Sequence, residues 1–420
     1  MKARRQGAGG RGQGRYALAL GACALALAGC GRTAAPAPSG EQSVVLVSID
    51  GFRSEYLDRY AAPHLRALAA SGVRARWMEP SFPVLTFPNH YTIVTGLTPA
   101  HHGIVNNTIV NPDDGSRFRM SDTVQVRRSV WWGGEPLWVT AERQGLRAAA
   151  FFWPGSEAAI GGVRPTFFKK YEEDVPLAAR VDTVLAWLTR PDSLRPRFVT
   201  VYFSTVDHAG HGSGPASDAV RAAVLAVDSA VGRLVGGLAL QQLSARVNVV
   251  VVADHGMAET SPERLVFLDD YVERNSVDAV SLGAFVAINP RNGDVTGLLR
   301  ALRAAPHLHV YPRDSTPESW RYQGNPRIPA IVGVPDEGWL LTTRAAQAAV
   351  RNPGIAGTHG FLPTDTSMHA LFIASGPSFR RGATVAPFRN VHVYELICAV
   401  LGLRPAPNDG SLDSVRTLLR

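Results

Sequence analysis

Three short apolar runs in this chain are each followed by side chains that commonly bind metal ions. The runs cover 43–49, 197–203 and 247–253, and each is rich in β-branched or aromatic residues. Runs of this kind are typical of parallel strands that are buried on both faces of a sheet. The side chains that follow them are, in chain order, Asp50, Asp207 with His211, and Asp254 with His255. Because open α/β sheets bind ligands at the carboxyl ends of their strands, the pattern predicts both a fold and a site.

Segments with helical spacing alternate with these runs. Apolar spacing predicts helices over 63–72, 177–188, 218–238 and 391–401, and apolar runs predict further strands over 145–153 and 368–374. Strands that alternate with helices indicate an α/β fold, with a mostly parallel central sheet covered by helices on both faces. The segments 106–136 and 265–356 are richer in turns, Arg and Pro, so we interpret them as insertions at the rim, where substrate selection usually resides.

The first 29 residues have the features of an export signal. Five of the eight net positive charges of the chain lie in 1–29, which contains no acidic residue. The apolar run 16–29 is too short to span a membrane as a helix. A signal peptide over 1–29 is therefore expected.

The end of this run predicts a lipid anchor. The residues LAGC at 27–30 resemble the lipobox of bacterial lipoproteins, in which the cysteine becomes the lipidated first residue. Cys30 would then hold the protein at the periplasmic face of a membrane. Gly31 lacks the aspartate associated with inner-membrane retention, which favours the outer membrane. Residues 30–42, rich in Pro and Ala, are interpreted as a tether. The alternative is a soluble periplasmic or secreted protein that is cut nearby.

Charge and cysteine content exclude two other classes. The sequence pI of about 9.7 invites a nucleic-acid interpretation, but most of the excess charge lies in the signal, and no basic stripe is interleaved with aromatic residues. Binding to a nucleic-acid duplex is therefore not expected. With Cys23 in the signal and Cys30 lipidated, only Cys398 remains, so no intrachain disulfide is expected.

Further residues fit the same site. Asp207 and His211 stand four apart, so one helical turn can direct both at one ion. His359 lies in GTHGF (357–361), where glycines let the backbone pass close to a bulky group. With the ligands named above, the set has three carboxylates and three imidazoles. Such a set suits zinc better than magnesium or calcium, which prefer oxygen ligands.

Thr86 is the candidate nucleophile. It lies in SFPVLTFPNH (81–90), and the apolar spacing beyond it indicates that a helix begins here. A hydroxyl at a helix N-terminus meets unpaired amides and the positive end of the helix dipole, which favour its alkoxide. Coordination to zinc would lower its pKa further. The alternative is that Thr86 serves only as an N-cap. The nearby His90 is interpreted as a packing histidine of this helix, not as a ligand.

Seven segments resemble the nucleotide pyrophosphatase/phosphodiesterase family of the alkaline phosphatase superfamily. They are VVLVSIDGFR (44–53), FPVLTFPNHYTIVTGLTPAHHGIVNN (82–107), WWGGEPLWVTAERQG (131–145), FFWPGS (151–156), STVDHAGHGSGP (204–215), VVVADHGM (250–257) and GTHGF (357–361). The resemblance implies an alkaline-phosphatase-like catalytic domain over 43–405, with the two insertions at its rim and a C-terminal tail over 406–420.

The resemblance also implies two zinc ions and a role for each site residue. One ion would be held by Asp207, His211 and His359, and the other by Asp50, Asp254 and His255, with Thr86 bound to the second as nucleophile. Asn107 matches the family's asparagine that donates to a phosphoryl oxygen, and Phe87 and Tyr202 would flank a nucleobase-like portion of the substrate by stacking.

The activity that the resemblance implies is cleavage of phosphodiester or pyrophosphate bonds of nucleotides through a phosphothreonine intermediate, releasing nucleoside monophosphates. Asn107 stands where monoesterases of the superfamily have an added arginine or third metal, which favours diesters. Three alternatives stay open: a phosphodiesterase for phosphocholine or lipid headgroups, a phosphonate hydrolase, and a surface lipoprotein that binds metal or nucleotide without turnover. A sulfatase is disfavoured, because Cys398 lies far downstream of the nucleophile position. The sequence does not indicate an oligomeric state.

Overall fold

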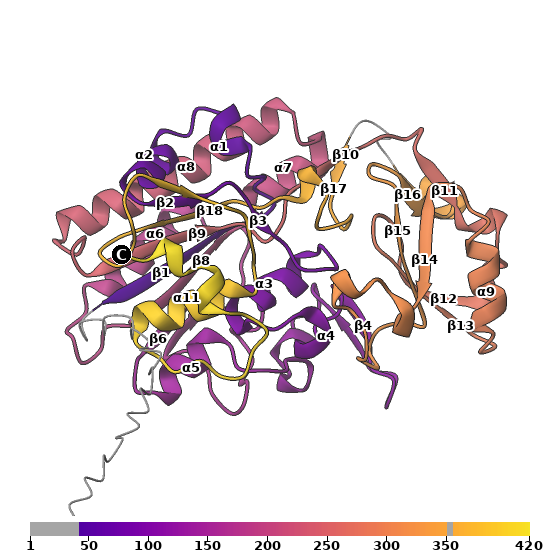
Figure 1. The fold of residues 1–420 in the computed structure, drawn as a ribbon, viewed down its shortest axis with the longest axis horizontal. Helices are drawn as coiled ribbons and strands as arrows, with labels where there is room; N and C mark the ends of the chain where they lie inside the picture. Colours follow the sequence, from indigo (N-terminus) through magenta and orange to yellow (C-terminus); the bar gives the residue numbers. More distant parts are fainter. Residues whose placement is uncertain (1–41, 351–355) are drawn as a thin grey trace, which may run out of the picture. The chain divides into compact units, whose positions relative to one another are not determined.

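The computed structural model describes residues 42–350 and 356–420, which are organised around an eight-stranded sheet (Figure 1). The strand order is β19-β2-β18-β9-β1-β8-β6-β7. In that order the strands span Ala383–Val385, Val73–Ala75, Phe372–Ser375, Val247–Val252, Ser43–Ile49, Phe198–Phe203, Ala148–Phe151 and Phe167–Lys169. Within this sheet, only β18 runs against its neighbours. The predicted mostly parallel α/β fold is thereby confirmed. The predicted signal peptide, Cys30 and the tether up to residue 41 lie outside the described residues.

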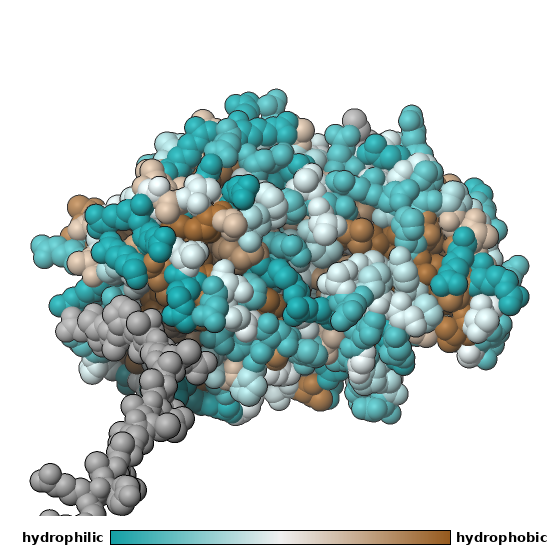
Figure 2. Space-filling model, viewed as in Figure 1, coloured by the Kyte–Doolittle hydropathy of each residue, from teal (hydrophilic) through white to brown (hydrophobic). Residues whose placement is uncertain are grey.

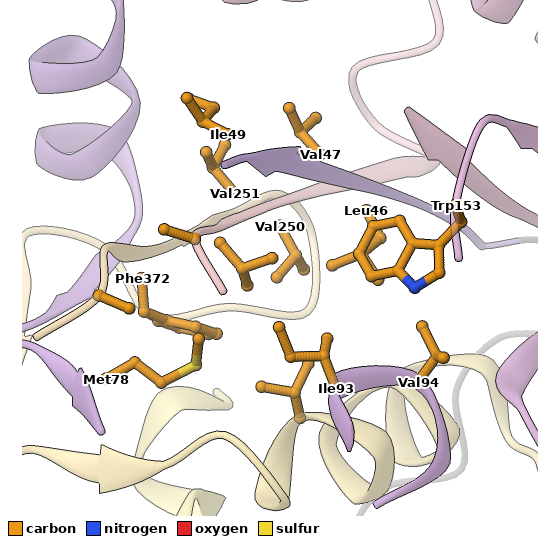
Figure 3. Packing of buried hydrophobic residues seen from close by; sticks show 14 of the residues in the cluster. Leu46, Val47, Ile49, Met78, Ile93, Val94, Trp153, Val250, Val251 and Phe372 are labelled. Atoms are coloured by element: carbon orange, nitrogen blue, oxygen red, sulfur yellow. The ribbon is translucent and has the colours of Figure 1, made fainter. Parts of the chain in front are cut away.

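The three central strands are buried on both faces. Every residue of β1 and β9 is buried. Leu46 of β1 lies opposite Val250 of β9 in the parallel register, and Figure 3 shows both pointing toward Ile93 and Val94. Val47, the next residue of β1, points to the opposite side (Figure 3). This alternation explains why these strands are near-continuous apolar runs, since each successive side chain meets a helix layer.

Helices cover both faces of the sheet (Figure 1). One layer holds α2 (Pro63–Ser71) and α8 (Asp218–Leu240), with α6 (Leu177–Leu188) and α7 (Thr205–Ser213) packed on α8. The other holds α3 (Thr86–Thr95), α5 (Leu137–Arg143) and α11 (His392–Leu401). The short α1 (Tyr56–Arg59) and α4 (Pro99–His102) complete the helices around the sheet. Helix α8 is long and apolar enough to cross a membrane by composition, yet its valine-rich face is buried over the sheet, as in a core helix.

The predicted elements agree with the structure apart from their ends. Strand β6 is shorter than the predicted 145–153, because Gly145 and Phe152 both have positive φ, of 83° and 66°, and so terminate the extended chain. Strand β18 starts at Phe372, since 366–368 forms a 3-10 turn. The existence of each element follows from the periodicity, whereas its bounds depend on local turns.

Both predicted insertions form small sheets of their own. Within 106–136, β4 (Thr108–Val110) pairs with β5 (Arg117–Arg119). Within 265–356, a four-stranded sheet has the order β12-β13-β15-β14. Its strands span Val277–Ser281, Val286–Pro290, Ile331–Pro335 and Leu308–Pro312, and α9 spans Val295–Leu302. Some residues of this part, such as Val286 and Ile288 of β13, form an apolar cluster separate from the main core, whereas Ala287 of β13 belongs to the main core. On the face seen in Figure 2, hydrophobic residues lie in small groups among hydrophilic ones.

A buried carboxylate from α8 caps the start of α2. Helix α2 has Ala62 at its N-cap and no side-chain cap of its own. Asp228 of α8 is 2% exposed and accepts hydrogen bonds from the backbone N–H groups of Leu65, at 2.8 Å, and His64, at 3.3 Å. The carboxylate therefore satisfies amides that the helix leaves unpaired and joins the two helices.

We expect Asp228→Ala to lower the free energy of unfolding by about 1–3 kcal/mol, because the backbone N–H groups at the start of α2 would lose their hydrogen-bond acceptor. Urea denaturation measures this loss. As a control, Asp182→Ala removes a solvent-exposed ion pair with Arg233 and should leave the midpoint nearly unchanged. Equal effects of the two substitutions would contradict the capping role of Asp228.

Candidate active site

The candidate ligands meet at one edge of the central sheet. Strands β9, β1 and β8 are neighbours and run parallel, so their carboxyl ends lie together. Asp50 follows β1 directly, Asp254 and His255 follow β9, and Asp207 lies in the first turn of α7, just after β8. The close approach of β1 and α7 requires Gly51, which has a φ of 68° and whose added Cβ would lie 2.9 Å from the Asp207 Cα.

One group of ligand atoms comes from α7 and a distant loop. Asp207, His211 and His359 each offer an atom within 4.8 Å of the others. The Asp207 Oδ1 atom lies 3.4 Å from the His211 Nε2 and 3.8 Å from the His359 Nε2. His359 follows β17 (Ala356–Thr358), which pairs with β10 (Ala258–Thr260) just beyond β9.

A second group lies beside the first. Asp50, Asp254 and His255 also offer atoms within 4.8 Å of one another, and all three are buried. The His255 Nε2 lies 2.9 Å from the Asp254 Oδ2 and 3.6 Å from the Asp50 Oδ1. The rings of His255 and His359 stack with centroids 3.6 Å apart, so the two groups adjoin. The structure thus contains two candidate metal sites.

The donor atoms in both groups fit divalent cations. One carboxylate oxygen of each of Asp50, Asp207 and Asp254 is buried without a hydrogen-bond partner. Such orphaned charge is costly unless an ion satisfies it. In each imidazole of the two groups the Nδ1–H donates to a backbone carbonyl, and the acceptors are Gly357 for His211, Gly256 for His255 and Val84 for His359. The Nε2 lone pairs are therefore directed at the carboxylates, as in metal sites whose histidines are oriented by outer partners.

The electrostatics of the groups also favour positive charge. Burial, followed by the charges of Asp254 and Asp207, raises the pKa of Asp50 well above its ordinary value. Burial likewise lowers the pKa of His359 well below its ordinary value, which keeps its lone pair available. The part of the Asp50 pKa shift that comes from Asp254 and Asp207 is repulsion between buried carboxylates, and a bound cation would offset it.

Thr86 lies at the edge of the second group. It is the first residue of α3, and its Oγ1 is 3.3 Å from the His255 Nε2. The N-cap position belongs to Leu85, which makes no side-chain capping hydrogen bond. The capping alternative for Thr86 is therefore wrong, and its hydroxyl faces the candidate ligands. Asn107 accepts a hydrogen bond from the Phe87 N–H through Oδ1, which leaves its Nδ2 group as a donor beside Thr86.

A pocket of about 350 Å³ opens over Thr86 and Asn107. Both insertions contribute to its lining, through Met120 from one and 281–285 from the other. Among the described residues that line it, none is a lysine or an arginine, and several are apolar. The remaining lining residues are Leu85, Asp207, His208, His211, Thr358 and His359. The pocket therefore combines the first ligand group with a wall that the insertions supply.

The two predicted stacking residues have different surroundings. Phe87 is partly buried beside Trp132. The Tyr202 hydroxyl donates to the Asp50 Oδ2 at 2.6 Å, so this residue holds a candidate ligand. Sequence reasoning missed Tyr171, which is 46% exposed and lies 6.2 Å from the Tyr202 ring. Nothing in its local pattern, FFKKY, distinguishes it from other surface aromatics, and only the fold brings it to this edge.

Comparisons with known proteins agree with this geometry. Residues 44–362 match the family model described as type I phosphodiesterase/nucleotide pyrophosphatase. Ectonucleotide pyrophosphatase/phosphodiesterase family member 3 of Rattus norvegicus is 37% identical over 401 residues, which are 92% of this chain and 45% of that protein. Venom phosphodiesterase 1 of Crotalus adamanteus is 37% identical over 403 residues, which are 93% of this chain and 46% of that protein. The chain thus spans about half the length of these relatives.

A solved structure has the same fold. It is an inactive threonine-to-alanine variant of murine ectonucleotide pyrophosphatase/phosphodiesterase 5 in complex with AMP, and it superposes with a TM-score of 0.85 at 33% identity. The match covers 90% of this chain and 100% of that one.

We expect the wild-type protein to bind two equivalents of a divalent cation, one for each ligand group. His211→Ala and Asp254→Ala should each lose one equivalent, because each removes a ligand from a different group. Equilibrium dialysis against zinc with elemental analysis measures the ratio. Cys398→Ala, at a buried thiol in α11, is the matched control and should keep both. Retention of both equivalents by His211→Ala and Asp254→Ala would show that the ligands are misassigned.

Proposed function

Because this chain belongs to the type I phosphodiesterase/nucleotide pyrophosphatase family, we propose that it is a zinc-dependent hydrolase of nucleotide phosphodiester and pyrophosphate bonds. The observation that carries the proposal is the position of the Thr86 Oγ1, 3.3 Å from the His255 Nε2 and next to both ligand groups. The AMP complex of the murine relative supports a nucleotide as substrate and a nucleoside monophosphate as product.

Each ligand group has the composition of a zinc site. Asp207, His211 and His359 would hold one ion, and Asp50, Asp254 and His255 the other, with Thr86 joining the second group. When bound, the two ions would offset the aspartate charges, make the Thr86 oxygen reactive and stabilise charge on the leaving oxygen.

The side chains themselves account for the remaining steps. The Thr86 oxygen attacks phosphorus, and the bond from phosphorus to the leaving oxygen breaks, which gives a phosphothreonine. Water then attacks the same phosphorus, the bond from phosphorus to the Thr86 oxygen breaks, and that oxygen takes a proton from the water as the monophosphate is released. The Phe87 N–H fixes the orientation of the Asn107 amide by donating to its Oδ1, and the Nδ2 group donates to a non-bridging oxygen as negative charge builds there.

Aromatic residues near the site support binding of a nucleobase. Phe87 is the residue next to the nucleophile, and we propose that its ring stacks on the base, a contact worth roughly 1–3 kcal/mol in known cases. The partly exposed rings of Tyr202, which contacts Asp50, and of Tyr171 lie 6.2 Å apart, and we propose that they form a second aromatic surface for the base. Because the Tyr202 hydroxyl is engaged by Asp50, its contribution to the base is limited to its ring, and Tyr171 is the more accessible of the two.

A second candidate function has one observation in its favour. The lining of the pocket includes Met120, Leu282 and Phe285 and no lysine or arginine among the described residues. An apolar wall of this kind suits a diester with a lipid-like leaving group better than one with a polyphosphate. A phosphodiesterase for lipid or choline headgroups is therefore the alternative.

We expect Thr86→Ala to lower the turnover of a nucleoside-monophosphate aryl ester by about 10³-fold or more, because the attacking oxygen is lost. Both cations should stay bound, because the three aspartate and histidine ligands of each group remain. Release of the aryl alcohol measures turnover, and elemental analysis measures the metal. In the wild type, the nucleotide ester should be cleaved faster than an aryl phosphocholine and faster than an aryl phosphate monoester. Preference for phosphocholine would favour the second candidate, and full activity of Thr86→Ala would refute the proposed nucleophile.

We further propose that the protein is exported and anchored through Cys30 at the periplasmic face of a bacterial membrane, with the outer membrane favoured. The support is the sequence LAGC at 27–30 after a basic and apolar leader. Radiolabelled palmitate should be incorporated into the wild type and not into Cys30→Ser. Absence of label from the wild type would leave the soluble exported protein as the better description, and equal labelling of the two would show that Cys30 is not the lipidated residue.

A further inference from the structure

His90 is a fully buried imidazole that belongs to neither ligand group. It lies one turn after Thr86 in α3, and its side chain is 0% exposed. Its Nδ1 lies 2.9 Å from the Thr86 carbonyl oxygen and 3.2 Å from the Asp254 Oδ2. Its Nε2 lies 2.8 Å from the Ser48 Oγ. One side chain therefore touches the residue of the nucleophile, a ligand of the second group, and β1 two residues before Asp50.

The partners determine which nitrogen carries the proton. A carbonyl oxygen and a carboxylate are acceptors only, so the Nδ1 that faces Thr86 and Asp254 carries the hydrogen. The Nε2 is then an acceptor, and the Ser48 hydroxyl donates to it. In this tautomer both nitrogens of the buried ring are satisfied. The Nδ1–H donates to the Thr86 carbonyl and presents its positive end to Asp254.

The ring has no room to rotate. Trp153 and Tyr202 each contact it edge to face, with centroids 5.1 Å and 5.2 Å away. The Trp153 Nε1–H also donates to the His90 carbonyl at 3.0 Å. The same Tyr202 donates to Asp50 through its hydroxyl. Tyr202 therefore contacts both the His90 ring and Asp50, a candidate ligand of the second group.

We propose that His90 is a positioning residue, which links the first turn of α3 to Asp254 and so keeps the Thr86 oxygen in register with the second ligand group. This inference rests on the proposed function for Thr86. The imidazole itself does not touch the pocket and takes no proton in the reaction. Its effect is on where the nucleophile and a ligand lie with respect to each other, as expected of groups that orient metal ligands from outside.

Two substitutions separate the two nitrogens. In His90→Asn, the side-chain amide N–H lies where the Nδ1–H lay and can still reach Thr86 and Asp254. In His90→Gln, the amide lies near the Nε2 position beside Ser48, and no donor remains at Nδ1. We expect His90→Gln to lower kcat by about 10- to 100-fold with KM nearly unchanged, and to weaken zinc binding at the second group by a similar factor in chelator competition. His90→Asn should recover most of both.

His102 provides the matched control. It is also 0% exposed, lies in the same layer, and is hydrogen-bonded through Nε2 to Thr92 and Pro88, away from both ligand groups. His102→Gln should destabilise folding as much as His90→Gln in thermal unfolding while keeping kcat and zinc affinity. Equal kcat and zinc affinity for His90→Gln, His90→Asn and the wild type, or equal losses in both His90 variants, would reduce His90 to a packing residue. The zinc competition tests the role of His90 even if the wild type does not hydrolyse diesters. A wrong role for His90 can therefore be distinguished from a wrong proposed function.

Discussion

Mutual repulsion of three buried carboxylates is the constraint on which this structure depends. Asp50, Asp207 and Asp254 each stand just past the carboxyl end of one of three adjacent strands, and each has a buried oxygen without a hydrogen-bond donor. Two like charges about 4 Å apart repel by roughly 4 kcal/mol at the effective dielectric of a protein surface. The sheet can hold these carboxylates close together because its central strands are buried on both faces. Bound cations would remove the repulsion between the carboxylates, which favours cation binding.

The imidazoles are as closely controlled as the carboxylates. Each candidate histidine ligand donates one ring N–H to a backbone carbonyl, which fixes its tautomer and directs its other nitrogen at an aspartate. Thr86 lies at the start of a helix whose Phe87 N–H donates to the Asn107 side chain, and the His90 ring lies against Asp254. The chemistry therefore depends on atoms that the main sheet positions, while the insertions contribute the pocket wall around them.

Much of this site could be predicted from the chain, for local reasons. The runs 43–49 and 247–253 are apolar except for Ser43, Ser48 and Asn248, a pattern that identifies strands buried on both faces. The carboxylate directly after each run then lies at the edge of the sheet where ligands bind. Asp207 and His211 are four residues apart, so both side chains lie on one face of α7. Bounds were less predictable, because the positive φ of Phe152 ends β6 early and no sequence rule indicates it for a phenylalanine.

The alternation of strands and helices and the kinds of donor atom available can be derived from the chain alone, since hydrophobic periodicity and side-chain chemistry are properties of short segments. Three contacts follow only from the packing of the whole chain: the Tyr202 hydroxyl donates to Asp50, Tyr171 lies beside Tyr202, and the His90 ring contacts both Thr86 and Asp254. The residue pairs Tyr171–Tyr202, Asp50–Tyr202 and His90–Asp254 are 31 to 164 positions apart in the chain. The contacts of His90 also depend on which of its ring nitrogens carries the hydrogen. Such pairings are fixed by the packing of whole layers, which no local pattern encodes.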